Sequence, residues 1–214
     1  MSGEGVLNND VFISDSMSSF EDHVFQVVIQ CQYSAKSEYE DFLTKRDALL
    51  VNNSWNDDDS SRKHFDALSK GKSNEVVMNE LLMRHRMGAV VKFGDIIQLL
   101  HVKSKKYLYV PGKDLARDER ENMLLTLSAE GGVNSWLQLL PRLKINKEGD
   151  SVSNSTEVVL RISERGQEHV HCSERAPSSA HRMREVNVSM ETQSSFRLSI
   201  YQSCLLYTSD AADE

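Results

Sequence analysis

Cysteine is scarce in this sequence, and its spacing is uninformative for metal or redox chemistry. Cys31, Cys172 and Cys204 stand far apart in 214 residues and form no CxxC pair. A zinc ribbon and a CxxC redox centre are therefore excluded. A disulfide framework is also unnecessary, because a chain of this length can bury a sizeable apolar core. We expect a globular protein of a reducing compartment.

The sequence also lacks long apolar runs and an excess of basic residues. Lys92 and Asp95 interrupt the most apolar stretch, and the first residues, MSGEGVLNNDVF, have neither the basic start nor the apolar centre of a signal peptide. The formal net charge of -7 argues against a non-specific nucleic-acid binder. We expect a soluble cytosolic chain with no nucleic-acid partner.

Signatures of catalysis are missing as well. The sequence contains no GxSxG, no Walker loop and no HExxH. The neighbouring acids Glu21 and Asp22 would point to opposite faces of a strand, so they could not readily share a substrate. We expect neither an enzyme nor a cofactor.

The last eleven residues, CLLYTSDAADE, resemble a translated sequencing adaptor more than natural protein. We therefore expect residues 204–214 to be a foreign tail and the natural chain to continue past Ser203. Met1 is interpreted as an internal methionine, so the chain is expected to be a fragment.

What is present is a change of hydrophobic period along the chain. Residues 20–30 alternate loosely between apolar and polar, which predicts a half-buried strand. Residues 34–51 and a second stretch that ends with NEVVMNELLMRHRM have helical periodicity, and Gly88 is expected to close the second helix. From Ala89 onward, short strand-like segments separated by turns predict a sheet.

The two helices are expected to form a hairpin whose apolar faces pack on each other. Ser37 and Glu40 have the spacing of a capping box. The predicted contact places Tyr39, Phe42 and Leu43 against Val77, Leu81 and Leu82. A projecting hairpin would also offer a second surface to a neighbouring subunit.

A threefold repeat is indicated among the strands. Three similar segments begin near Phe25, Trp136 and Phe196, and Leu108 and Val170 occupy corresponding places in two strand–turn–strand units. Short strands repeated three times predict a mainly β fold of the β-trefoil type. The first spacing exceeds the second by about the length of the helical hairpin. We therefore expect one domain over residues 1–203, with the arm inserted at about 34–87.

Several segments resemble the N-terminal domain of inositol trisphosphate and ryanodine receptors, a family of intracellular calcium-release channels. They are FEDHVFQVV, YSA at 33–35, GAVVKFGDIIQLLHVKSKKYL, NSWLQLLPRLKINKEGDSV and EVVLRI. The similarity extends from about residue 6 to 203. It implies a β-trefoil, MIR-like, with a protruding helix-turn-helix arm.

The resemblance also implies a regulatory role. Such a domain lowers ligand affinity and couples ligand binding to gating, and coupling of this kind is reciprocal. The implied partners are the rest of the same channel, neighbouring subunits of a homotetramer and regulatory proteins. The family's phosphate-binding residues lie in later domains, so no inositol trisphosphate site is expected here. The implied location is the cytosolic face of the endoplasmic reticulum membrane, reached only through a C-terminal pore domain that this chain lacks.

Two departures from the family pattern bear on these expectations. The family has a strand before the segment that matches GVLNNDVFIS, so the first lobe is expected to lack a strand. Leu143 occupies a place where relatives can carry an aromatic residue that contacts the rest of the receptor. We expect Arg142, Leu143 and Lys144 to form an interdomain interface.

Other candidate sites are weaker. The basic turn with Lys103, Lys105 and Lys106, joined by Lys113, could hold an anionic group, although a solvated turn anchored by Tyr107 and Leu108 is the favoured interpretation. His169 and His171 share one face of a strand and Cys172 lies on the other, which is too few ligands to predict a metal site. Asp57, Asp58 and Asp59 lack the spacing of a calcium loop and are expected to solvate the arm tip.

One alternative function stays open from the sequence. A free-standing trefoil of the MIR type could bind protein or glycan partners, and a signal peptide with disulfides would favour it. A ricin-like lectin would carry QxW triplets, and the sequence has none.

Overall fold

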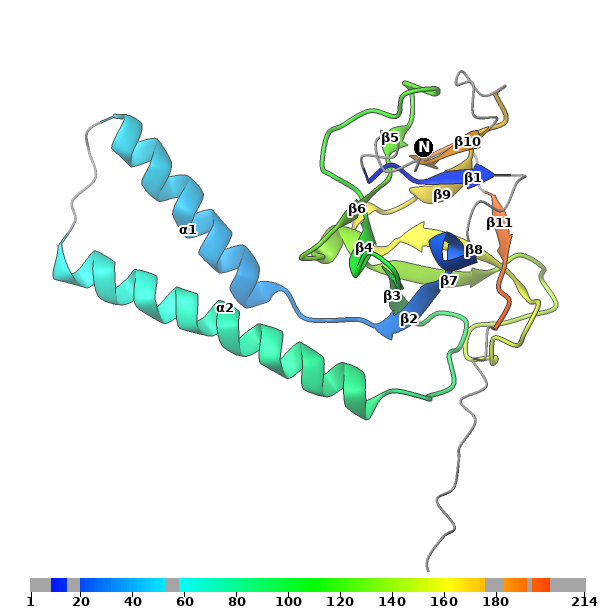
Figure 1. Cartoon of the computed structure of the whole chain (residues 1–214), viewed down its shortest axis with the longest axis horizontal. Helices are drawn as coiled ribbons and strands as arrows, with labels where there is room; N and C mark the ends of the chain where they lie inside the picture. The colour runs from blue at the N-terminus through cyan, green and yellow to red at the C-terminus, as the bar shows by residue number, and fades with distance from the viewer. Residues whose placement is uncertain (1–8, 15–19, 53–57, 176–182, 192–193, 201–214) are drawn as a thin grey trace, which may run out of the picture.

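The computed structural model describes residues 9–14, 20–52, 58–175, 183–191 and 194–200. The expectations about residues 204–214 and Met1 lie outside these residues. The described chain has a mainly β body and a long arm of two helices that projects from it (Figure 1). The prediction of a mainly β protein with a helical insertion is confirmed.

The strands form one antiparallel sheet that curls around a core. Its path runs β1-β10-β9-β8-β7-β3-β4-β6, with β11 on β8, β2 on β3 and β5 on β10. The strands are β1 Phe12–Ser14, β2 Phe25–Ile29, β3 Ile96–His101, β4 Lys106–Tyr109, β5 Met123–Leu124, β6 Thr126–Ser128, β7 Leu137–Pro141, β8 Glu157–Ile162, β9 His169–Cys172, β10 Met183–Ser189 and β11 Ser195–Arg197. Short 3-10 helices are η2 Phe20–His23, η3 Val133–Ser135 and η4 Ser163–Arg165.

The same pairing scheme occurs in two consecutive four-strand units. In the first unit β3 pairs with β4, β4 with β6 and β3 with β7. In the second unit β8 pairs with β9, β9 with β10 and β8 with β11. Leu100 pairs with Tyr107 and Arg161 pairs with His169, so Leu108 and Val170 follow at the same place in each hairpin. Both of these residues are buried in the core.

The core is built from the inward-facing residues of these strands. Its members include Phe93, Ile97, Leu108, Val110, Leu125, Leu137, Leu139, Val158, Leu160, Ile162, Val170, Val186 and Val188. Branched residues dominate the list, because a branched side chain packs well on the pleated surface of a sheet. Leu108 thus holds its hairpin to the core, as the sequence predicts.

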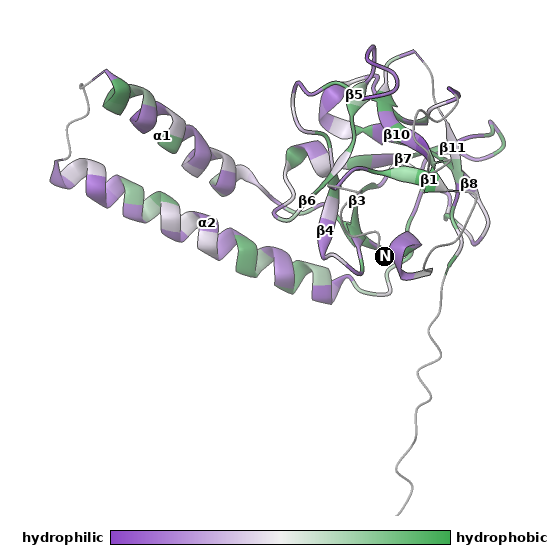
Figure 2. Cartoon of the chain, turned by 45° about the horizontal axis from the view of Figure 1, so that its top comes forward, coloured by the Kyte–Doolittle hydropathy of each residue, from purple (hydrophilic) through white to green (hydrophobic). Residues whose placement is uncertain are grey.

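The arm consists of α1 Ser34–Val51 and α2 Asp59–His85. Apolar and polar residues alternate along both helices (Figure 2). Tyr39 and Phe42 pack on Phe65, with ring centroids 5.7 and 6.1 Å apart, and each such aromatic pair contributes about 0.5–1.5 kcal/mol beyond its buried area. These contacts join α1 to the first half of α2.

Two details of the predicted arm are wrong. Val77 and Leu81 do not pack on α1, and they are 55% and 52% exposed. They are exposed because α2, with 27 residues, is longer than α1, with 18. The second half of α2 continues beyond the start of α1. The capping box of Ser37 and Glu40 is wrong as well, because α1 already begins at Ser34. Gly88 follows the end of α2 with φ +81°, as a residue that ends a helix should.

Candidate functional site

The predicted interface residues lie together on the loop after β7. Arg142, Leu143 and Lys144 are all exposed, and Ile145 next to them is 80% exposed. A turn holds this stretch, with the Asn146 amide donating to the Leu143 carbonyl at 3.2 Å. The loop therefore presents two apolar side chains between cations. The sequence reasoning missed Ile145, although an isoleucine inside a polar loop was visible.

The base of this loop is fixed to the segment that leaves the arm. The Phe93 amide donates to the Asp150 carbonyl and the Gly149 amide to the Phe93 carbonyl, each at 2.9 Å. Gly94 has φ +93°, and a Cβ there would lie 3.3 Å from Cγ of Glu148. Backbone hydrogen bonds consequently join the loop to the segment between the arm and β3.

The arm joins the β body through a paired amide. The side chain of Asn79 on α2 donates to the Gln32 carbonyl at 2.7 Å and accepts from the Gln32 amide at 2.9 Å. Asn79 is 9% exposed and is the buried residue of α2. The side chain thus pairs with the backbone of the linker before α1 much as a neighbouring strand would.

A carboxylate from α2 caps the start of α1. Glu75 accepts hydrogen bonds from the amides of Ala35 and Lys36, at 2.8 and 3.0 Å, and from the Ser34 hydroxyl at 3.2 Å. The first amides of a helix have no partner within it and favour negative charge. Glu75 therefore fixes the angle between the two helices at the base of the arm.

Lysines of the arm hold it to the loop before η3. Lys36 donates to the Gly131 carbonyl at 2.9 Å and lies 3.1 Å from the Glu130 carboxylate, and Lys72 lies 3.9 Å from the same carboxylate. The hydrogen bond and charge of Lys36, with the charge of Lys72, lower the pKa of Glu130. Gly131 has φ +65°, and a Cβ there would lie 2.5 Å from the Tyr33 hydroxyl.

A buried cluster of hydrogen-bonded polar groups lies near the start of α1. The Gln98 side chain accepts from the Cys31 amide at 3.0 Å and donates to the hydroxyls of Tyr33 and Ser135 at 2.7 and 2.6 Å. The Trp136 indole donates to the Cys31 carbonyl at 3.0 Å. Burial raises the pKa of Tyr33 to about 12 and that of Cys31 to about 11. These groups stay neutral at physiological pH, and their hydrogen bonds hold the segment before α1 to β3 and η3.

The basic turn is engaged in local contacts. The ammonium of Lys103 lies 2.7 Å from the Asp22 carboxylate, and Lys106 donates to the Asn9 side chain at 2.5 Å. Lys105 occupies the turn with φ +56°. With Leu108 in the core, the turn has the contacts of a scaffold element. Lys113 lies on a separate exposed loop.

The histidines of β9 differ in environment. His171 is buried, with its Nδ1 3.1 Å from the Ser194 hydroxyl and its Nε2 3.5 Å from the Glu119 carboxylate. Burial lowers the pKa of His169 and raises that of Cys172. Over the described ranges no cluster of three or more His, Cys, Asp or Glu could hold a metal ion. The absence of a metal site stays a prediction.

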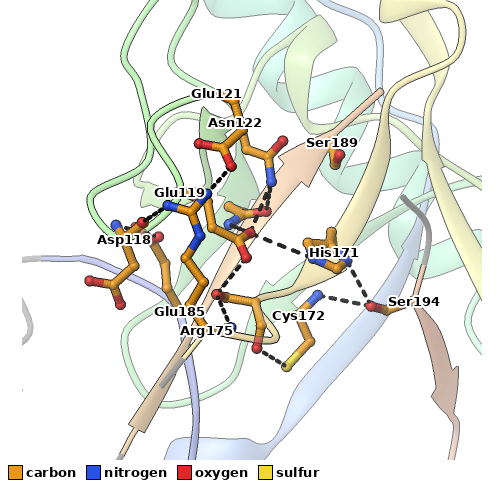
Figure 3. A network of polar contacts seen from close by, with 12 residues as sticks. Asp118, Glu119, Glu121, Asn122, His171, Cys172, Arg175, Glu185, Ser189 and Ser194 are labelled. Carbon is orange, nitrogen blue, oxygen red and sulfur yellow. Dashed lines mark hydrogen bonds and ion pairs between the residues drawn. The ribbon is translucent and has the colours of Figure 1, made fainter. Parts of the chain in front are cut away.

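The sequence reasoning missed a network of buried carboxylates (Figure 3). Glu119 accepts hydrogen bonds from Asn122, Asn187 and Ser173 at 2.8–3.0 Å. Its burial would raise its pKa, but these hydrogen bonds and His171 outweigh burial and lower it. Glu185 accepts hydrogen bonds from the amides of Arg117 and Asp118 at 2.7 and 3.0 Å. Both glutamates are less than 9% exposed. Together they fasten the polar loop before β5 to β9 and β10.

The acidic residues of the arm tip have structural roles. The Asp58 carboxylate caps α2 by accepting from the Ser61 amide at 2.8 Å, and Asp59 lies 2.7 Å from Lys63. Both are exposed, as expected for a solvated tip. Asp57 lies outside the described residues.

Comparison with known proteins gives one family. A family model described as Inositol 1,4,5-trisphosphate/ryanodine receptor matches residues 1–205. The inositol 1,4,5-trisphosphate receptor itr-1 of Caenorhabditis elegans is 31% identical over 141 residues, which are 66% of this chain and 5% of that protein. The chain thus spans a small part of the length of this curated relative. A Caenorhabditis elegans structure described as a protein with unknown function is 18% identical, covers 51% of this chain and 62% of its own, and has a TM-score of 0.42.

Proposed function

Since the chain belongs to the inositol 1,4,5-trisphosphate/ryanodine receptor family of calcium-release channels, we propose that it is a cytosolic regulatory domain that modulates ligand affinity and couples ligand binding to gating. One observation carries the proposal. An exposed loop of alternating basic and apolar residues is hydrogen-bonded at its base to the segment that leads from a long projecting arm into β3. The two surfaces share one framework, so a contact at either can affect the other.

The fold that we propose for this role is a β-trefoil of one domain over residues 1–203. The recurrence of one pairing scheme in the two consecutive units supports it. Contacts between strands that are distant in the sequence support it as well. β10 pairs with both β1 and β5, and Asp10 forms a bridge to Thr126 of β6. In this scheme β1 and β2 are the third and fourth strands of the remaining unit, and the arm follows β2.

The first interface is the loop with Arg142, Leu143 and Lys144. An exposed apolar pair between cations fits a partner surface that is apolar with acidic edges, since complementary charge steers association and apolar contact supplies affinity. We assign this loop to contact with the following parts of the same channel or with a neighbouring subunit of the homotetramer.

The second half of α2 offers a second surface. Val77, Met78 and Leu81 are each more than half exposed and lie on the part of α2 that α1 does not cover. Contiguous exposed apolar side chains are characteristic of protein contact sites. This face fits a neighbouring subunit or a regulatory protein.

No ligand site for inositol trisphosphate is proposed on this chain. In the basic turn Lys103 is paired with the Asp22 carboxylate, and Lys106 donates to the neutral side chain of Asn9. The parent channel would act at the endoplasmic reticulum membrane. Among the described residues no helix has the length and apolar character needed to cross a bilayer.

The test is removal of this domain from the parent receptor. Agonist affinity should rise when residues 1–205 are deleted, because a domain that restrains gating must weaken agonist binding. Coupling of this kind typically amounts to about 5- to 150-fold in the dissociation constant. Equilibrium binding of labelled agonist to both forms measures it. Equal affinities would count against a regulatory role.

A further inference from the structure

The second half of α2 presents apolar side chains on the side that faces away from the β body. Figure 1 shows this half running past the start of α1. Asn79 marks the inner side of the helix, because it is buried and bonded to the linker before α1. A helical residue advances by about 100°, so Val77 and Leu81, two positions to either side of Asn79, lie on the outer side. Both are more than half exposed, as is Met78 beside them.

The spacing on this outer side is that of a coiled-coil contact. Residues 70, 74, 77, 81 and 84 follow one another at intervals of four and three, which is the heptad pattern. They are Lys70, Asn74, Val77, Leu81 and Arg84, and all five are exposed. We call these five residues the outer stripe. Its spacing suits contact with another helix, whose side chains would fit between those of the stripe.

The outer stripe has an apolar centre and a positive charge at each end. Lys70 and Arg84 are separated by about 21 Å along the helix, or about four turns. Within the described chain neither of them forms an ion pair, although Asp66 and Glu80 stand one turn before them. The next cation towards the arm tip, Lys63, is different, because its ammonium lies 2.7 Å from the Asp59 carboxylate. The two end charges of the stripe are therefore available to a partner.

We propose that the outer stripe binds an amphipathic α-helix with carboxylates about four turns apart on either side of an apolar centre. The proposal rests on the assignment of this face to protein contact made above. Carboxylates of the partner meet Lys70 and Arg84, and its apolar side chains cover Val77, Met78 and Leu81. Apolar contact holds such a pair of helices together, and the charges beside it select the partner.

Two other occupants fit the charges less well. A second copy of α2 laid on this stripe in either direction would bring cations together at both ends, and like charges oppose such pairing. An anionic membrane would be repelled by Asp58 and Asp59, which are exposed at the start of the same helix. An acidic helix is the occupant that the charges favour.

A pair of designed peptides tests the charge rule. Each is a fluorescein-labelled helix of about 18 residues, built of alanine and glutamine, with leucines opposite Val77, Met78 and Leu81. One peptide has glutamate opposite Lys70 and Arg84, and the other has lysine there. Fluorescence anisotropy with the full chain should show saturable binding of the glutamate peptide and about three- to tenfold weaker binding of the lysine peptide. Added salt should reduce this difference.

Charge reversal on the chain gives the matched test. Lys70→Glu combined with Arg84→Glu should invert the preference, so that the lysine peptide binds more tightly than the glutamate peptide. An arm that had only lost its structure would bind neither peptide, so inversion separates recognition from unfolding. Leu81→Asn should weaken both peptides alike. Lys45→Glu, the same charge change on the exposed part of α1, should leave the preference unchanged.

The outcomes separate this proposal from the regulatory role. Equal binding of the two peptides, or binding of neither, would overturn the acidic helix as the occupant. Binding of the chain to phosphatidylserine vesicles that Leu81→Asn abolishes would overturn it in favour of a membrane. A dimer in sedimentation velocity that Leu81→Asn abolishes would overturn it in favour of a second copy. None of these measurements involves agonist, whereas the regulatory role fails if deletion of residues 1–205 leaves agonist affinity unchanged.

Discussion

At the scale of single residues, the least expected feature is the pair of buried glutamates, Glu119 in the loop before β5 and Glu185 on β10. Glu119 lies in the segment ARDEREN, whose polarity indicates a solvated loop. Asn187 was the available signal, because it is flanked by Val186 and Val188 on a strand, and a polar residue buried in a sheet needs a partner. Its partner could not be identified, since Glu119 lies far away in the chain.

Glu119 makes the stability of the fold depend on pH. Its folded pKa lies below the ordinary value of 4.5, so its contribution is present above 4.5 and is lost as the pH falls through the lower folded pKa. Urea unfolding should therefore show Glu119→Gln destabilised at neutral pH, with the difference from wild type shrinking as the pH falls below 4.5. Glu121→Gln is the control, because Glu121 contacts Arg175 on the surface. A difference that does not vary with pH would contradict the assignment.

At the scale of elements, periodicity predicted the two helices but not their contact. A 3.6-residue repeat predicts a helix, and helices are found at both places, α1 Ser34–Val51 and α2 Asp59–His85. It does not say where one helix begins against the other, and that offset leaves Val77 and Leu81 exposed. Glu75 and Asn79 were missed for a related reason. Both are polar residues on a helix, and their partners are backbone groups more than 35 residues earlier.

Asn79 should fix the arm to the β body. Asn79→Ala removes both part-buried hydrogen bonds to Gln32, which should lower the free energy of unfolding by about 1–3 kcal/mol, since each such bond contributes about 0.5–1.5 kcal/mol. Exchange of the Gln32 amide should also become faster. Asn74→Ala, at an exposed position of the same helix, should change both quantities little. Equal effects of the two substitutions would show that Asn79 does not hold the arm.

At the scale of the whole molecule, the sequence predicted a mainly β fold better than it predicted which distant strands pair. Corresponding apolar positions such as Leu108 and Val170 were recognisable because a core places similar residues at equivalent places. The threefold arrangement stays a proposal, since two units have the full pairing scheme and only β1 and β2 of the described part of the chain are assigned to a third. Pairing between distant strands leaves no local trace in a sequence, so β1 beside β10 could not have been predicted.

The proposed coupling can be tested with one surface residue in the parent receptor. Leu143→Asp places a charge in the loop contact and should not disturb the fold, because Leu143 is 54% exposed. If the loop transmits restraint, agonist should bind several-fold more tightly, in the same direction as deletion of the whole domain. Leu115→Asp is a matched control, since Leu115 is 56% exposed and lies on the loop before β5. Equal agonist affinities for the two variants would place the restraint elsewhere, with the exposed face of α2 as the next surface to alter.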